Sequence, residues 1–200
     1  MDETVTLRPR FGRIPAALVA LIAAVGIIAA IVSRDTNQLR YIGLLLLVAF
    51  LAWLTYWRPA VVISPAGVEL VNLFRTRRVT WPAIQRIETK YALTLYTAVG
   101  KFTAWAAPAP SRLAAGRASK RDVTGLPEST YSAEKRVGLG DLPHSDSGAA
   151  ALQVRRRWES YRDAGLLDRP EGTGVVTTWH WLSVVAFAAL IVASILSFVF

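Results

Sequence analysis

The sequence predicts an α+β membrane protein with three transmembrane helices and a small antiparallel β domain that ends in a helix. Three observations predict this fold class. The chain of 200 residues is 53% hydrophobic, its apolar residues gather in three long runs, and the polar stretch between the second and third runs has the pattern of short strands. The net charge is +9 and there is no cysteine, which excludes disulfides, thiolate nucleophiles and cysteine metal sites.

The three apolar runs are each long enough to cross a lipid bilayer. They occupy 15–32, 41–57 and 179–200, and none of them contains Asp, Glu, Lys or Arg. A helix crosses the hydrocarbon in ~20 residues, with about 17 to 25 acceptable. Buried core helices are the alternative interpretation, but the rest of so short a chain is too small to bury three of them. We therefore predict three transmembrane helices at these positions.

The N-terminal segment 1–14 is predicted to be a cytoplasmic tail. Its arginines, Arg8, Arg10 and Arg13, also fit the n-region of a secretory signal peptide. The first apolar run is longer than the usual h-region of ~7–15 residues, and a second run follows almost at once. Both facts favour a retained helix over a cleaved signal.

Arginine and lysine residues near the helix ends predict the orientation of the chain. The tail has three of them, the loop 33–40 has two, and the stretch 58–178 has eighteen. We therefore predict an external loop and a cytoplasmic polar stretch, in a multi-pass protein of the cell membrane. Amphipathic rings prefer the headgroup level, and the aromatic residues predicted to lie at this interface are Trp53, Tyr56, Trp57, Trp179 and Trp181.

Residues 58–112 are predicted to form the β domain, and they contain eight basic and two acidic residues. Val68–Leu73 and Leu93–Tyr96 alternate between apolar and polar side chains, as half-buried strands do. Turn chemistry separates such runs, as in Ser64–Gly67, where a proline fixes φ and a glycine permits positive φ. Short strands at close spacing predict an antiparallel sheet or a small barrel.

The stretch after the β domain divides into three parts. Segment 113–147 is rich in Ser, Gly and charged residues without periodicity, and is predicted to be a disordered polar insertion. Residues 148–165 are predicted to form an amphipathic helix that closes one side of the sheet, and 166–178 a linker. The apolar stripe of this helix consists of Ala151, Val154, Trp158 and Tyr161.

The stretch 58–112 resembles the bacterial pleckstrin-homology-like (PH-like) domain found in small membrane proteins of high-GC Gram-positive bacteria. The residues that carry the resemblance are Val62–Val68, Asn72-Leu73, Arg77–Trp81 with Ile84 and Ile87, and Thr103–Pro110. The resemblance implies a strongly bent antiparallel sheet capped by a C-terminal helix, and it implies no particular reaction. Because 113–147 intervenes before the helix 148–165, that helix is either the PH cap or a separate helix leading to the membrane.

Four basic residues, Arg58, Arg75, Arg77 and Arg78, are the candidate contacts for an anionic lipid or a partner protein. An arginine near an anionic leaflet contributes ~1 kcal/mol of attraction. The alternative is that they are positive-inside residues and charged strand edges, which hinder edge-to-edge aggregation. The loop between the first two expected strands, Ser64–Gly67, has no basic residue, so the resemblance does not extend to the phosphoinositide pattern of eukaryotic PH domains.

Two further groups have a structural and a functional interpretation. The run Arg155–Arg157 suits a basic helix lying on a membrane, or else solvated arginines beside a packed Trp158. Trp81 and Trp105 suit stacking on a ligand, or else core packing of a small sheet, which we favour for both.

No residue pattern predicts catalysis, cofactor binding or a metal site. His144 and His180 are isolated, and no nucleophile elbow, triad or phosphate loop is present in the sequence. We therefore expect a protein that is not an enzyme and has no cofactor, no small-molecule substrate and no nucleic-acid partner.

The function expected from these observations is that of a non-enzymatic, membrane-anchored PH-like interaction or scaffold module at the cytoplasmic face of the cell membrane. Its expected partners are membrane lipids and a protein of unknown identity. The alternative function is the binding of anionic lipid headgroups, or envelope sensing, through the basic hairpin.

Overall fold

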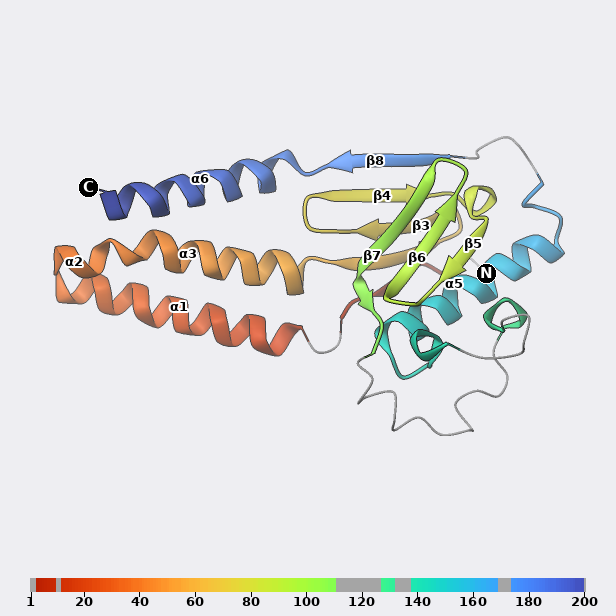
Figure 1. Ribbon diagram of the computed structural model, residues 1–200, viewed down its shortest axis with the longest axis horizontal. Coiled ribbons are helices and arrows are strands. Elements are labelled where there is room, and N and C mark those ends of the chain that lie inside the picture. The colour runs from red at the N-terminus through yellow and green to blue at the C-terminus, as the bar shows by residue number, and fades with distance from the viewer. Residues whose placement is uncertain (1–2, 10–11, 111–126, 132–137, 169–173, 200) are drawn as a thin grey trace. The chain divides into compact units, whose positions relative to one another are not determined.

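The computed structural model describes residues 3–9, 12–110, 127–131, 138–168 and 174–199. The chain divides into two compact units, each assembled from segments far apart in the sequence. The helical unit comprises Arg10–Arg58 and Trp179–Phe200, and the β unit comprises Met1–Pro9 and Pro59–Thr178. Figure 1 shows the elements of both.

The helical unit contains three long apolar helices. Its elements are α1 (Arg13–Ser33), α2 (Thr36–Leu39), α3 (Tyr41–Ala52) with its π-helical continuation η1 (Trp53–Trp57), and α6 (Trp181–Val199). The stretches Arg13–Ser33, Asn37–Trp57 and Trp181–Val199 are long and apolar enough to cross a membrane. They coincide closely with the three apolar runs of the sequence.

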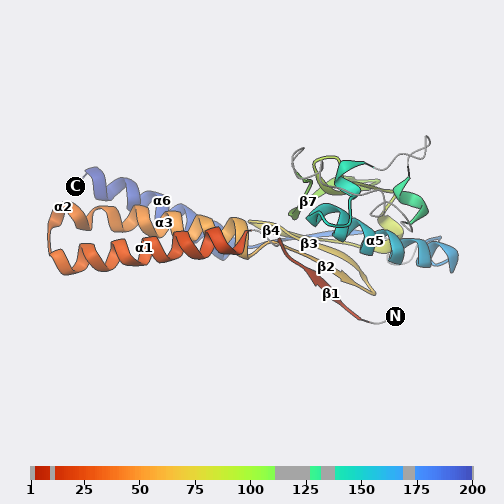
Figure 2. The ribbon, with the colours of Figure 1, turned by 90° about the horizontal axis from the view of Figure 1, so that it is seen from below.

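Helix α3 lies between α1 and α6, as Figures 1 and 2 show. The buried residues of α1 are all small: Ala16, Ala23 and Ala30, at seven-residue spacing. On α3, a Cβ added to Gly43 would lie 3.3 Å from the Cα of Ser194 in α6. Small residues allow helix backbones to approach closely, which is how helices associate when no hydrophobic force drives them together.

Contacts at the two ends of the helical unit define the helix directions. At one end, the Ser197 hydroxyl donates to the Arg40 carbonyl oxygen at 2.9 Å. At the other end, the Arg13 guanidinium lies 5.7 Å from the centroid of the Trp57 ring. The starts of α1 and α6 and the end of η1 therefore share one end of this unit. This end carries the predicted interface aromatics, Trp53, Tyr56, Trp57, Trp179 and Trp181, all of them exposed.

The β unit contains two antiparallel sheets and one long helix. The five-stranded sheet has the order β1 (Val5–Leu7), β2 (Ala60–Ser64), β3 (Gly67–Val71), β4 (Arg75–Val79), β8 (Val175–Trp179). The three-stranded sheet has the order β5 (Arg86–Glu88), β6 (Ala92–Thr97), β7 (Gly100–Pro108). Figure 1 shows the second sheet crossing the first, and α5 (Asp146–Asp163) contacts strands of both sheets. This confirms the predicted α+β class with antiparallel sheets and a C-terminal helix.

The core of the β unit lies between the two sheets and α5. It is built from alternate residues of the strands and from one face of the helix: Val61, Ile63, Val68, Leu70, Val79, Leu93, Leu95, Ala150, Ala151 and Val154. Trp81, in the 3-10 turn η2 (Trp81–Ala83), is 1% exposed. Its Nε1 donates to the carbonyl oxygens of Ser64 and Pro65, both at 3.1 Å. Trp81 is therefore a core residue, as favoured from the sequence.

The two outer strands of the larger sheet are not predicted by the sequence pattern. Strand β1 lies within the predicted tail 1–14, and β8 lies at the end of the predicted linker 166–178. Strand β1 pairs with β2 in the register Val5↔Ile63 and Leu7↔Val61. Three residues are too few for alternation to be recognised, so the pairing partner, far away in sequence, is what makes β1 a strand. The tail prediction and the linker prediction are wrong at these positions.

Part of the predicted disordered insertion is ordered. Residues 127–131 and 138–147 contain two 3-10 turns, η4 (Glu128–Thr130) and η5 (Leu139–Asp141). Gly140 of η5 packs so closely on β5 and its following residues that an added Cβ would collide with the Thr89 carbonyl oxygen. Periodicity cannot reveal such a turn, because a single tight backbone contact fixes it. The other residues of the insertion, 113–126 and 132–137, lie outside the described part of the chain.

Helix α5 is fixed to the sheets by its arginines as well as by its apolar stripe. Arg155 is 3% exposed. It donates to Asp141 of η5 at 2.5 Å and to the Ile87 carbonyl oxygen at 3.1 Å. Asp141 also accepts from the Thr89 hydroxyl at 2.7 Å. The expectation that the three arginines of this run are solvated is therefore wrong for Arg155, because a buried carboxylate on the preceding turn neutralises it.

We predict that Arg155→Met lowers the free energy of unfolding by about 3–5 kcal/mol, because it leaves the Asp141 carboxylate buried without its cation. The measurement is denaturant unfolding of the full-length protein in detergent micelles, followed by tryptophan fluorescence. Arg156→Met is the matched control, because Arg156 is exposed on the same helix and should change stability by less than about 0.5 kcal/mol. Equal effects of the two substitutions would contradict the buried ion pair.

Candidate functional site

The three arginines of β4 do not share one face of the sheet. Residues opposite each other on antiparallel strands point to the same side, and the register pairs Leu70 with Arg77 and Glu69 with Arg78. Leu70 is fully buried in the core, so Arg77 points inward, toward the second sheet. Arg75 shares that face, because side chains alternate along a strand. Arg78 points outward.

Arg78 is neutralised on the outer face of the sheet. Its guanidinium lies 2.7 Å from a carboxylate oxygen of Glu69 on the neighbouring strand. The side chain is more than half exposed, so this pair is a cross-strand contact of modest strength. Arg78 is therefore already paired with an acidic residue within the β unit.

Arg77 lies between the two sheets without an acidic partner. Its guanidinium carbon is 4.6 Å from the centroid of the Phe102 ring on β7. Its Nε is buried and has no hydrogen-bond partner in the described structure. Burial lowers the pKa of the Arg77 guanidinium from its ordinary value, and the charge of Arg75 lowers it further. Arg77 nevertheless stays charged, because arginine does not lose its proton in proteins.

The acidic residues of the two sheets leave Arg77 uncompensated. The eight strands contain two carboxylates, Glu69 and Glu88, and both belong to outer faces. Glu88 accepts from the Tyr96 hydroxyl at 2.9 Å and pairs with Arg86 at 3.1 Å. Each acid thus already has a cation beside it, and neither of them pairs with Arg77.

Asn72 fixes the two sheets to each other beside these arginines. It follows β3, and its side-chain amide donates to the Thr103 carbonyl oxygen and accepts from the Trp105 amide, both at 2.9 Å. Its backbone N–H donates to the Arg75 carbonyl oxygen at 3.0 Å. One side chain therefore positions β7, with Phe102, opposite the start of β4. Asn72 is among the residues that carry the family resemblance, and the sequence alone does not predict this bridging role.

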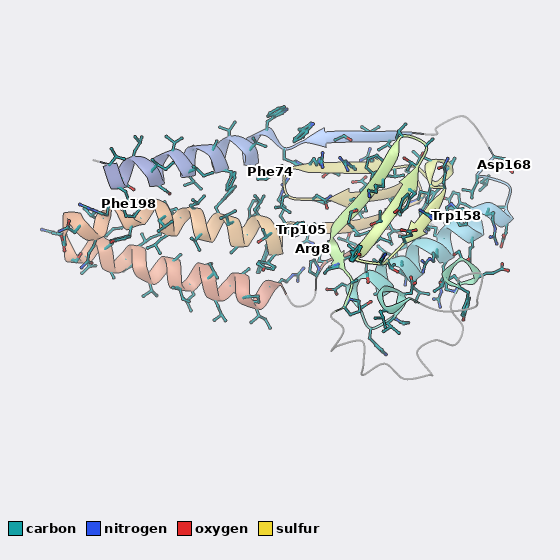
Figure 3. All side chains as sticks on the ribbon, in the orientation of Figure 1. Arg8, Phe74, Trp105, Trp158, Asp168 and Phe198 are labelled. Carbon is teal, nitrogen blue, oxygen red and sulfur yellow. The ribbon has the colours of Figure 1, made fainter. Side chains whose placement is uncertain are left out.

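Trp105 differs from the sequence expectation. It is 53% exposed on β7, between the buried residues Ala104 and Ala106, so it points to the outer face of the three-stranded sheet (Figure 3). The core-packing interpretation is wrong for this residue, because small alanines occupy the inward positions of β7 instead. Trp158 does pack inward, and its Nε1 donates to the Ile84 carbonyl oxygen at 3.1 Å.

One end of the five-stranded sheet collects every chain connection to the apolar helices. Because Leu7 pairs with Val61, the end of β1 lies beside the start of β2. Gly174, just before β8, accepts from the Thr80 amide just after β4, so β8 finishes beside the start of β4. The turn between β3 and β4, which contains Phe74 (Figure 3), lies there too. We call this the connection end of the sheet. Arg75, the first residue of β4, lies at it, whereas Arg77 is the middle residue of the strand.

The remaining predicted candidates belong to the helical unit. Arg58 and all five interface aromatics belong to this unit. Trp179 is also the last residue of strand β8. In the described part of the chain, no group of three His, Cys, Asp or Glu residues is arranged to hold a metal ion. The candidate site itself offers the guanidinium of Arg77 beside the Phe102 ring.

We predict that Asn72→Ala speeds the hydrogen exchange of the Trp105 amide by about two- to ten-fold, because that N–H loses its side-chain acceptor. The measurement is hydrogen–deuterium exchange on the full-length protein in detergent. The amide of Ile87 in β5, which Asn72 does not contact, serves as the internal control. Unchanged protection of Trp105 would contradict the bridging role of Asn72.

Residues 58–121 match the family model described as Bacterial PH domain. The comparison with curated proteins gave no match, and neither did the comparison with solved structures. The matched stretch contains strands β2 to β7, whereas β1, α5 and β8 lie outside it. The site built on Arg77, Phe102 and Asn72 lies entirely within the match. The predicted resemblance is thus confirmed as a match of residues 58–121 to this family model.

Proposed function

We propose that this protein is a non-enzymatic, membrane-anchored PH-like interaction module whose β unit is held at the cytoplasmic face of the cell membrane. The observation that carries the proposal is the connection end of the sheet. There the chain passes from β1 toward α1, returns from η1 into β2, and passes from β8 into α6. A sheet joined to three apolar helices at one end suits a domain anchored on a membrane surface.

The pairing of β1 with β2 supports a specific topology. Residues 5–7 hydrogen-bond to residues 61–63, so both must lie on the same side of any bilayer that the helices cross. Two apolar spans separate these strands, which is the even number of crossings that this requires. The third span follows β8 and takes the C-terminus to the opposite side. The excess of arginine and lysine in the tail and the β unit favours the cytoplasm for their shared side.

Anchoring would allow a small β unit to bind a partner through a weak surface contact. A tethered domain meets a partner in the same membrane at a high effective concentration, so a weak surface contact is occupied. The exposed Trp105 and the half-exposed polar residues around it on the three-stranded sheet supply a surface of the kind that protein partners contact. We propose a protein partner within the membrane or at its surface, and a scaffold role for the module.

Single-cysteine labelling tests the proposed topology, since the natural chain has no cysteine. We expect Thr4→Cys and Lys101→Cys, both at exposed positions, to react with an impermeant maleimide only in inside-out vesicles. Asn37→Cys, in α2 at the start of the second span, should react only in intact cells. Labelling of the Thr4 and Lys101 variants from opposite sides would rule out the β1–β2 pairing in the membrane.

Partner capture tests the interaction role. We expect tagged full-length protein, extracted from its native membrane in mild detergent, to retain a stoichiometric protein partner identified by mass spectrometry. The control is a chain in which 58–112 is deleted, which keeps the helices and should lose the partner because the contact surface is gone. Retention of the same partner by the deletion chain would assign binding to the helices and contradict a module role for the β unit.

A further inference from the structure

We infer that the outer edge of β8 binds an extended segment of another integral membrane protein, one that directly follows a transmembrane helix on the cytoplasmic side. The bound segment adds a further strand to the five-stranded sheet, antiparallel to β8. The inference rests on the proposed membrane anchoring. It adds the surface of the β unit that is contacted and the kind of protein segment that fits it.

Strand β8 is open along one edge. It is the terminal strand of the larger sheet, beside β4 (Figure 1). In the described part of the chain, no strand pairs with its other edge. Val175 packs against the core, whereas Val176, Thr177 and Thr178 are all exposed. The strand is therefore held mainly by its pairing with β4, and most of its β-branched side chains add little to the core.

The other outer strands of the two sheets are protected against further pairing. Proteins protect an open edge by making the strand short, by charges or proline, or by covering it. Strands β1 and β5 have three residues each; β5 carries two charges, and Pro9 follows β1 closely. On β7, the Asn72 side chain occupies the Thr103 carbonyl oxygen and the Trp105 N–H. Strand β8 has five residues without charge or proline, so it lacks these protections.

The pairing with β4 shows which backbone groups of β8 point to the open edge. The Gly174 carbonyl oxygen, just before β8, accepts from the Thr80 amide, so the backbone groups of Gly174 face β4. Successive residues of a paired strand direct these groups to alternate sides. The N–H and C=O groups of Val175 and Thr177 therefore point outward. A further strand satisfies groups of this kind, which is recognition by β-strand addition.

The place of β8 in the chain selects the direction of the bound segment. Strand β8 ends at Trp179 and α6 begins at Trp181, so in an anchored protein the end of β8 lies at the membrane surface. The pairs β1–β2, β2–β3, β3–β4, β5–β6 and β6–β7 are all antiparallel. An antiparallel segment on β8 begins beside the membrane and runs away from it. A segment that directly follows a transmembrane helix does the same.

A second copy of this chain does not supply such a segment from its described strands. Strand β2 follows an apolar helix directly, but β1 and β3 occupy both of its edges. Strands β1 and β8 precede apolar helices, so they run toward the membrane. The bound segment therefore comes from a different membrane protein. We expect it to be rich in β-branched or aromatic residues and free of proline, because such residues pair well across strands.

Photocrosslinking of the full-length protein in its native membranes tests this inference. Benzoylphenylalanine replaces Val176, which is 61% exposed, and mass spectrometry maps the residue to which it attaches. We expect one main product, with a different integral membrane protein, attached at a residue that closely follows one of its transmembrane helices on the cytoplasmic side. The matched control places the same probe at Val99, which is 75% exposed between β6 and β7. It should not give this product.

A proline substitution tests whether the backbone of β8 makes the contact. Thr177→Pro removes an outward N–H and leaves the groups that face β4, a position at which an edge strand tolerates proline. It should lower the yield of the Val176 product about ten-fold. Thr177→Ala keeps the N–H and should retain the product. Exchange protection of the Trp105 amide, in the other sheet, checks the fold of the proline variant. If that protection is lost, the attachment site mapped from Val176 decides.

Several results overturn the inference. These are a product between two copies of this chain, attachment to lipid without protein, attachment to a residue that precedes a transmembrane helix, equal yields from Val176 and Val99, or an unchanged yield in folded Thr177→Pro. The proposed interaction module survives any of them if partner capture still depends on 58–112, because another surface of the β unit then binds the partner. Loss of capture removes the module itself, and failure of the labelling pattern removes the membrane anchoring.

Discussion

The pairing of β1 with β2 is the constraint on which the rest of the structure depends. These strands are neighbours in the sheet, yet α1, α2, α3 and η1 lie between them in the chain. An antiparallel pair places the end of one strand beside the start of the next, so an intervening segment of any length must return to the point where it left. A pair of antiparallel helices does so by construction. The helical hairpin therefore returns the chain to the sheet, where β2 pairs with β1.

Polar contacts of the β unit repeatedly join segments that are distant in the sequence. They help to explain why its outer strands, β1 and β8, come from opposite ends of the polar sequence. Arg157 of α5 donates to the carbonyl oxygen of Glu3, just before β1, at 2.8 Å. The Thr80 hydroxyl accepts from the Gly174 amide, just before β8, at 3.0 Å. Two outer strands that are too short to persist alone are each held by such a contact.

The sequence predicts those features that depend on local pattern. Three apolar runs, the turn at Gly67 and the stripe of Ala151, Val154 and Trp158 each follow from composition or periodicity, and the structure contains them. It does not predict features set by contacts between distant residues: strand β1, strand β8, the burial of Arg155 and the outward position of Trp105. For the site, Arg77 and Arg78 are predicted together, because the sequence alone does not show which face of the sheet each arginine occupies. Only the register with Leu70 and Glu69 assigns them to opposite faces.

Cysteine cross-linking of β1 to β2 tests the central claim most directly. Thr6 and Val62 are register partners on the outer face of the sheet, and facing Cα atoms of paired strands, about 4.5–5.5 Å apart, are within reach of a disulfide. Thr6→Cys with Val62→Cys should cross-link in native membranes under mild oxidation. Thr6→Cys with Glu69→Cys should not, because that position lies one strand further away, at ~10 Å. Absence of the first cross-link, or equal yield of both, would contradict the account.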